Sequence, residues 1–351
     1  MKIYIPNIDF KNTNPKDLFL LIRPFYSVNG WNNNSKKDWE LAENINYVEN
    51  IEQATHVLLP LSINKYFEDK KSKQFLYDLN EQCKKLKIKA FGIIYRDFGV
   101  SFPFLSNIVY YRMSGFKCQL AKNNYGFPVA ISDHFERIYK QKEIFISTKK
   151  EKALIGFCGH ATRSLKKRIT ENLVMINENL KRFFSNPLRH DFEPLFASAY
   201  QRVLILEKFL HSNSITTNFI LRKDYRAGAI SLSEREKTTL EYYTNIIESD
   251  YIFCMRGTGN FSVRFYETLM MGKIPIFVNT DCLLPFEDYI NWKDHVVWIE
   301  WEERDNIVEI VTNFHSKLSN EQFIDLQNKN RKLWKETLSV KGMLKIISKI
   351  N

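Results

Sequence analysis

The segment that decides the fold is residues 251–278, which read YIFCMRGTGNFSVRFYETLMMGKIPIFV. It opens and closes with apolar runs, Tyr251–Met255 and Ile274–Val278, and a glycine-containing loop follows the first run. The stretch Ser262–Met271 between them is amphipathic. Short apolar runs bounded by glycine are typical of buried parallel strands, which need a helical crossover between them. The segment therefore predicts a strand, a loop, a helix and a second strand of an α/β fold.

The loop has the residue types of an anion-binding site. Gly257 and Gly259 let the backbone approach a ligand closely. The loop leads into a helix N-terminus, where unpaired N–H groups and the helix dipole favour negative charge. Ser262 is a candidate N-cap or phosphate donor, and Arg256 and Arg264 can bind phosphate in a bidentate manner.

Glu267 lies three residues after Arg264, so the two side chains share one face of the predicted helix. A carboxylate at that position can accept hydrogen bonds from two ribose hydroxyls. Each residue also has a purely structural interpretation. Arg264 and Glu267 could form only a surface ion pair, Ser262 could serve only as a helix cap, and the glycines could serve only the geometry of the turn. The whole set together favours a nucleotide site.

The rest of the chain repeats the alternation of short apolar runs and longer amphipathic stretches. The predicted strands are Lys2–Ile5, His56–Leu59, Ile88–Tyr95, Ile108–Tyr110, Pro128–Ile131, Ala153–Gly159, Thr217–Leu221 and Val296–Glu300, besides the two above. The predicted helices are 65–86, 163–180, 200–211 and 233–248, besides 262–271, with more after Glu302. The basic, aperiodic stretch 140–152 is the candidate linker.

This pattern predicts two Rossmann-like α/β domains that face a cleft. We expect an N-terminal acceptor domain over 1–145, a C-terminal donor domain over 146–335, and a last helix over 336–351 that packs back on the first domain. Ligands of open α/β sheets bind beyond the carboxyl ends of the strands. The loops after Cys158 and Met255 are therefore the expected site.

The segment resembles the exostosin-type (GT47-type) family of inverting glycosyltransferases, which have the two-domain GT-B fold. The residues that carry the resemblance are Gly257, Gly259, Ser262, Arg264, Glu267, Gly272, Pro275, Asp281 and Leu284-Pro285-Phe286, with Ile290-Asn291-Trp292 as a continuation. Three weaker matches lie upstream: Ala54–Leu61, Gly156–Gly159 with Arg163, and the connection from Leu221-Arg222 to Asp250. The sequence departs from the family at Lys273, where a cysteine or small residue is usual, and the N-terminal half matches loosely.

The resemblance implies donor diphosphate binding by Ser262 and Arg264, ribose binding by Glu267, and a phosphate contact from Arg163. The predicted donor-binding set is Gly159, Arg163, Arg256, Gly257, Gly259, Asn260, Ser262, Val263, Arg264 and Glu267. The resemblance also favours a UDP-sugar donor. A GDP-fucose-dependent, fucosyltransferase-like enzyme is an alternative, although its expected Thr-Glu-Lys run is missing. A non-catalytic nucleotide- or glycan-binding module on the same fold is another.

Two patterns bear on mechanism. The sequence contains no Asp-x-Asp, so we expect arginines and a helix N-terminus, with no metal or other cofactor, to stabilise the leaving diphosphate. Pro275 stands eight residues after Glu267, where retaining GT-B enzymes carry a second glutamate. An inverting transfer usually needs a base from the other domain. Asp97, Asp133 and His134 are candidates, although Asp97 could pair with Arg96 and Asp133 could cap a helix.

Composition limits the remaining classes. Of 351 residues, 44% are hydrophobic, which excludes disorder. The five cysteines form no CxxC pair, so we expect neither a zinc site nor a disulfide framework. This cysteine usage fits a reducing cytoplasm best. The N-terminus is interrupted too soon for a signal peptide, and no apolar run approaches ~18 residues.

The net charge of +11 attracts polyanions, and residues 140–190 are rich in lysine and arginine. No nucleic-acid-binding signature accompanies them. A solvated helix face is one interpretation; peripheral contact with anionic lipid, beside a lipid-linked glycan acceptor, is the other. The expected protein is thus a cytoplasmic enzyme at the inner face of the plasma membrane that transfers sugar to lipopolysaccharide or capsule.

Overall fold

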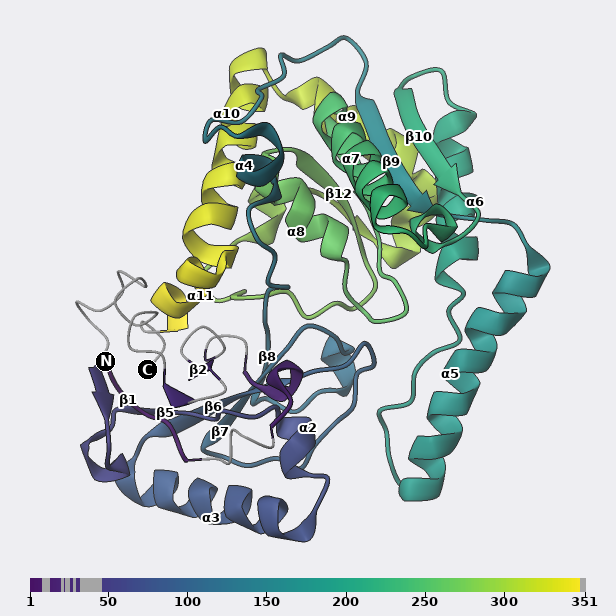
Figure 1. The fold of residues 1–351 in the computed structure, drawn as a ribbon. Coiled ribbons are helices and arrows are strands. Elements are labelled where there is room, and N and C mark those ends of the chain that lie inside the picture. The colour runs from purple at the N-terminus through teal and green to yellow at the C-terminus, as the bar shows by residue number, and fades with distance from the viewer. Residues whose placement is uncertain (8–12, 20–21, 23–25, 28–29, 32–45, 348–351) are drawn as a thin grey trace.

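The computed structural model describes residues 1–7, 13–19, 22, 26–27, 30–31 and 46–347, which build two parallel sheets (Figure 1). The first sheet has the order β4-β1-β5-β6-β7-β8, and the second has the order β10-β9-β11-β12-β13. Neighbouring strands are parallel throughout both sheets. The predicted pair of Rossmann-like domains with C-terminal helices, the GT-B arrangement, is confirmed.

The first sheet is covered on its outer face by one long helix, α3 (Lys70–Leu86) (Figure 1). Its strands are β1 (Lys2–Tyr4), β4 (Asn46–Val48), β5 (His56–Leu58), β6 (Lys89–Ile94), β7 (Ile108–Arg112) and β8 (Asn124–Gly126). Short α2 (Ile63–Tyr66) precedes α3, α4 (His134–Tyr139) follows β8, and β2 (Tyr26–Ser27) pairs with β3 (Gly30–Trp31). The Asp69 carboxylate caps α3 by accepting from the Ser72 N–H at 2.9 Å, so the predicted helix 65–86 is divided there.

The predicted strand Pro128–Ile131 is wrong. The sixth strand is β8, which ends at Gly126, and residues 127–133 form a connection without strand pairing that leads to α4. Two causes are visible. Pro128 has no N–H for a ladder, and the edge beyond β8 is taken by Pro285, which bridges to Gly126. A Cβ on Gly126 would lie 2.2 Å from the Leu284 carbonyl oxygen, so glycine permits this contact.

The second domain is built around the five-stranded sheet, which contains the two strands predicted from residues 251–278. Its strands are β9 (Leu154–His160), β10 (Thr216–Arg222), β11 (Tyr251–Cys254), β12 (Ile274–Asn279) and β13 (Val297–Glu300). Its helices are α5 (Leu165–Ser185), α6 (Ser198–Leu210), α7 (Leu232–Glu248), α8 (Val263–Met270), α9 (Ile307–Lys317), α10 (Asn320–Leu333) and α11 (Val340–Ile347). Met343 of α11 belongs to the same hydrophobic cluster as Ile3 and Phe91 of the first sheet.

The domains are joined by the Asn260 side chain and by the segment that follows β12. The buried Asn260 amide nitrogen donates to the carbonyls of Gly115, Thr280 and Asp281 at 2.9–3.1 Å. After β12, Cys282 bridges to Phe116 of the first domain. Asn260 therefore connects both domains through buried hydrogen bonds, which hold the relative position of the two sheets.

The predicted linker lies against the second domain and is tied to a buried lysine. The Lys273 ammonium is fully buried and donates to the Ser147 hydroxyl at 2.7 Å. The Ser147 backbone is held by the Gln327 side chain at 2.8 and 3.0 Å. Burial lowers the pKa of Lys273 to about 8. The negative charge of Asp250 raises this pKa and the positive charge of Lys150 lowers it, but burial is the largest effect.

The Lys273→Met substitution is expected to raise the free energy of unfolding at pH 7 by about 1–3 kcal/mol, because it removes a desolvated charge. Between about pH 8 and 10.5 the unfolded chain keeps the Lys273 proton and the folded chain releases it, so wild-type stability gains with pH there. The variant lacks this gain. Urea denaturation at several pH values gives the free energy of unfolding of the variant and of the wild type. The difference between these two free energies should narrow above pH 8, and a difference that stays constant with pH contradicts the prediction.

Candidate active site

A cavity of about 450 Å³ opens at the carboxyl ends of β9, β10 and β11. Twelve of the residues that line it are Asp97, Gly159, His160, Arg202, Arg222, Tyr242, Tyr243, Gly257, Gly259, Ser262, Arg264 and Glu267. All but Asp97 come from the second domain. Parallel strands bring these loops to one sheet edge, as the topology predicts.

The glycine loop reaches both the cavity and the first domain. Gly257 lies in the cavity wall, and a Cβ there would stand 3.6 Å from the Arg202 guanidinium. Gly259 faces the other domain, where a Cβ would lie 2.3 Å from the Asp97 carbonyl oxygen. Ser262 is the N-cap of α8 but makes no side-chain capping bond, and with Val263 it lines the cavity. The loop therefore presents the start of α8 to a ligand.

Arg264 is held in place by β9. Its Nη2 donates to the Cys158 carbonyl at 2.9 Å, and its guanidinium lies 4.3 Å from the centre of the Phe157 ring. A Cβ at position 159 would come within 2.5 Å of Nη2, so glycine at this position leaves room for the arginine. Gly159 thus positions Arg264, which was not apparent from the motif.

Three arginines in the cavity wall have unsatisfied donors. The buried Nε atoms of Arg202, Arg222 and Arg264 make no hydrogen bond, and neither does Nε2 of His160. Burial, with the charges of Arg264 and Arg256 nearby, lowers the pKa of Arg202 to about 10. Positive charge is therefore concentrated with too few acceptors, the electrostatic condition that favours an anionic ligand.

Two of these arginines were not among the predicted site residues. Arg222 ends β10 and pairs in register with His160 at the end of β9, so its place at a carboxyl strand end was a usable signal. Its Nη2 also donates to the Glu241 carboxylate at 2.5 Å. Arg202 lies on α6 and donates to the carbonyls of His160 and Arg256 at 3.2 and 2.8 Å. No local sequence signal marks Arg202.

Glu267 is oriented by two tyrosines of α7. The hydroxyls of Tyr242 and Tyr243 donate to its two carboxylate oxygens at 2.5 and 2.8 Å. Burial raises the pKa of both hydroxyls, and the Glu267 charge raises it further. Both tyrosines therefore remain donors at neutral pH, and the carboxylate keeps lone pairs that face the cavity it lines.

Arg256 and Asn260, both in the loop, are used elsewhere and do not line the cavity. Arg256 is 1% exposed, lies between the Phe116 and Phe196 rings, and donates to the Thr258 carbonyl at 2.9 Å. Its predicted phosphate contact is not supported by this geometry, and neither is one from Asn260, which joins the domains. Arg163 is exposed, also lies outside the cavity lining, and forms a bidentate pair with Glu207 on α6.

The three candidate bases lie in different surroundings. Asp97 is exposed and lines the cavity from the first domain. Asp133 caps α4 and forms a bidentate ion pair with Arg331, at 2.7 and 3.1 Å. His134 packs 5.1 Å from the Tyr243 ring, and burial lowers its pKa. Of the three, Asp97 is the one that the structure brings to the cavity.

The described residues contain no cluster of three or more His, Cys, Asp or Glu side chains that could hold a metal ion. The expectation of metal-independent chemistry therefore stays a prediction.

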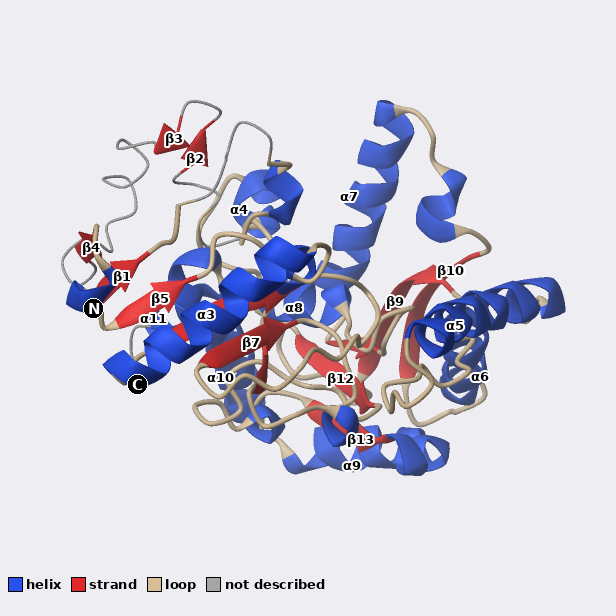
Figure 2. Cartoon of the chain, turned by 90° about the horizontal axis from the view of Figure 1, so that it is seen from below, coloured by secondary structure: helices blue, strands red, loops and turns tan. Residues whose placement is uncertain are grey.

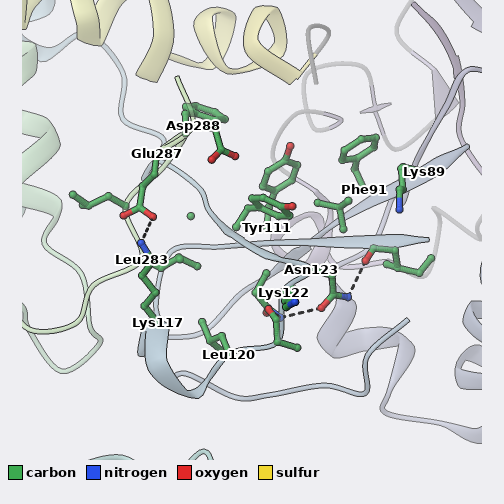
Figure 3. A pocket seen from close by; sticks show the side chains of 18 of the residues that line it. Lys89, Phe91, Tyr111, Lys117, Leu120, Lys122, Asn123, Leu283, Glu287 and Asp288 are labelled. Carbon is green, nitrogen blue, oxygen red and sulfur yellow. Dashed lines mark hydrogen bonds and ion pairs between the residues drawn. The ribbon is translucent and has the colours of Figure 1, made fainter. Parts of the chain in front are cut away.

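A second cavity, of about 720 Å³, lies on the first sheet beside the segment after β12 (Figure 3). Phe91 and Tyr111 lie on the sheet, and Lys117 pairs with Glu287 across the cavity rim at 2.6 Å. Tyr125 and Tyr289 add rings that are 43% and 51% exposed. Aromatic rings beside charged groups suit a ligand with apolar faces and hydroxyl edges.

Comparison with known proteins agrees with the site. Residues 148–314 match the family model described as the exostosin GT47 domain. Exostosin-1 of Drosophila melanogaster is 29% identical over 100 residues, which are 28% of this chain and 13% of that protein. The probable beta-1,4-xylosyltransferase IRX10L of Arabidopsis thaliana is 30% identical over 81 residues, 23% of this chain and 19% of that protein. The matches thus span less than a fifth of either relative.

Among solved structures, the apo form of the lipopolysaccharide outer core galactosyltransferase WaaB aligns over 100% of both chains, with 15% identity and a TM-score of 0.40. The family match is the more specific finding, because its boundaries enclose every residue in the cavity lining except Asp97. The resemblance to the exostosin-type family is therefore confirmed for residues 148–314, the part of the chain that holds the glycine loop and its arginines.

Proposed function

We propose that the chain is an inverting, metal-independent glycosyltransferase that moves a sugar from a nucleotide-sugar to a glycan acceptor. One observation carries the proposal: Arg264, the start of α8 and the Glu267 carboxylate line one cavity. Arginines and a helix N-terminus suit a diphosphate, and an oriented carboxylate suits ribose hydroxyls. The family resemblance favours a UDP-sugar.

The reaction is a single displacement. The acceptor hydroxyl oxygen forms a bond to the anomeric carbon while the bond from that carbon to the diphosphate oxygen breaks. Arg202, Arg222 and Arg264 stabilise the charge that develops on the leaving diphosphate. A base takes the acceptor proton as the new bond forms. The position of Asp97 in the cavity wall supports this residue as the base.

The acceptor in this proposal is a surface polysaccharide such as lipopolysaccharide or capsule, extended at the inner face of the plasma membrane. The second cavity supports a glycan, because its exposed tyrosines can stack on sugar rings remote from the reacting hydroxyl. A GDP-fucose-dependent transfer and a non-catalytic binding module remain the alternatives that experiments must separate.

A thermal-shift screen of nucleotides and nucleotide-sugars tests the donor. We expect UDP or a UDP-sugar to raise the melting temperature, because a ligand that binds only the native state stabilises it. A shift with GDP and GDP-fucose alone would favour the fucosyltransferase-like alternative. No shift with any nucleotide would contradict the proposed donor site.

The Asp97→Asn variant tests the base. We expect kcat to fall by about 100-fold or more, because the amide cannot accept the acceptor proton, while the nucleotide-induced thermal shift stays as in wild type. Asp78→Asn, on the exposed face of α3 and outside the lining of both cavities, is the control and should keep its turnover. Near-normal kcat in Asp97→Asn would remove Asp97 from the mechanism.

A further inference from the structure

Helix α5 presents its apolar side to solvent. Seven of its eight exposed apolar residues lie on that side: Leu165 (65%), Ile169 (58%), Leu173 (54%), Ile176 (40%), Leu180 (48%), Phe183 (46%) and Phe184 (79%); the eighth is Val174 (49%). Met175 is the one apolar side chain of this helix that is buried. We propose that the seven residues other than Val174, the α5 stripe, dock on an anionic membrane surface.

Polar contacts set the orientation of the helix. Arg182 is 4% exposed and pairs with Glu178 and Glu193, each at 3.2 Å. The Glu171 carboxylate accepts from the Ala199 N–H at 3.1 Å. Breaking a buried ion pair is strongly destabilising, so α5 cannot rotate to bury its apolar side against the protein. The stripe therefore needs a partner outside this chain.

The spacing places the stripe on one side of the helix. Residues 169, 173, 176, 180 and 183 follow steps of four and three, and 165 and 184 extend the row at the two ends. A helix of 21 residues is about 31 Å long. Figure 1 shows α5 along the side of the molecule, running from the second domain to the level of the first, and Figure 2 also places it at an edge of the molecule. A continuous row of this length differs from scattered exposed leucines and indicates an interaction surface.

Charge selects the partner. Lys166 and Lys181 are exposed beside the stripe, while Glu171 and Glu178 turn toward the protein. The helix carries five basic and two acidic residues, a balance of 5 − 2 = +3, within a chain of net charge +11. A second copy of α5 would bring the same positive charge and no acidic flank to pair with it. Anionic headgroups supply the opposite charge, and the apolar side chains enter the boundary between headgroups and acyl chains.

Among the described residues, no helix combines the length and apolar character that crossing a membrane requires. The stripe would therefore lie in the interface plane. The inference rests on the proposed function in one respect, because that function makes the membrane the place of a lipid-linked acceptor.

The test is co-sedimentation of the full chain with vesicles of equimolar phosphatidylglycerol and phosphatidylcholine, and with vesicles of phosphatidylcholine alone. We expect binding to the first that is at least about 10-fold tighter than to the second. The double variant Leu173→Glu/Leu180→Glu should lose at least about 10-fold in binding to the anionic vesicles. The matched control is Leu232→Glu/Leu240→Glu on α7, whose leucines are 78% and 53% exposed, and it should bind like wild type.

Two outcomes overturn the proposal: equal loss in both double variants, or no binding of the wild type to anionic vesicles. Light scattering provides a third outcome that would overturn the proposal. If the wild type is a dimer and the Leu173→Glu/Leu180→Glu variant is a monomer, the stripe binds a second copy of the chain. The nucleotide-induced thermal shift is measured on the same proteins. A retained shift without vesicle binding refutes only the membrane inference, whereas a lost shift in every protein refutes the donor site.

Discussion

Replacing Arg264 with alanine is expected to lower nucleotide-sugar turnover by about 100-fold or more. The guanidinium lies in the cavity wall at the start of α8, fixed by the Cys158 carbonyl at 2.9 Å and by the Phe157 ring. Removing one preorganised donor from a site where negative charge develops costs about 3–4 kcal/mol of transition-state stabilisation. Steady-state turnover of the donor, with the nucleotide-induced thermal shift alongside, measures the loss.

The matched control is Arg304→Ala. Arg304 also stacks on an aromatic ring, 4.2 Å from the centre of Trp301, but it does not line the cavity. Its replacement should leave turnover within about twofold of wild type, because the lost contacts lie outside the site. Equal losses in the two variants would show that Arg264 acts through stability alone. Gly159→Ala should reproduce part of the Arg264 effect, because its Cβ would meet the guanidinium.

Glu267→Gln is expected to weaken nucleotide binding by about 10- to 100-fold with a smaller change in kcat, since ribose contacts are made equally in ground and transition states. The amide offers one acceptor oxygen where the carboxylate offers two, so the Tyr242 and Tyr243 hydroxyls compete with ribose for it. Titration with the nucleotide gives the dissociation constant directly.

Glu248→Gln, on the exposed face of α7, is the control for Glu267→Gln. It removes the same charge without touching the cavity and should bind the nucleotide like wild type. A Tyr242→Phe/Tyr243→Phe variant separates orientation from contact, because it keeps the carboxylate and removes both of its donors. If Glu267→Gln bound the nucleotide as tightly as wild type, ribose recognition by this residue would be excluded.

Much of the candidate site was visible in one continuous segment. The cavity lining includes Gly257, Gly259, Ser262, Arg264 and Glu267, as their spacing predicted. Their placement was predictable because a strand, a tight loop and a helix start have geometry set by residues close in sequence. The same local logic predicted both parallel sheets, and it failed at Pro128–Ile131, where an apolar run without a ladder partner resembled a strand.

Other parts of the site could not be predicted in this way. Arg256 and Asn260 belong to the same loop, but neither lines the cavity. Arg256 lies between the Phe116 and Phe196 rings. Asn260 forms hydrogen bonds at the junction of the two domains. Arg202 and Arg222 come from elements far away in the chain. Their neighbours, and therefore their use, depend on how α6 and β10 pack beside β9.

The sequence by itself determined the strand–loop–helix unit at 251–278 and the anion-binding character of its loop, because both depend on local periodicity, glycine and the end of a helix. The tertiary structure alone decided which arginines share the cavity, which carboxylate faces it from the other domain, and which side of α5 meets solvent. These depend on contacts between residues distant in sequence, whose free energies appear only when the two sheets and their helices have packed together.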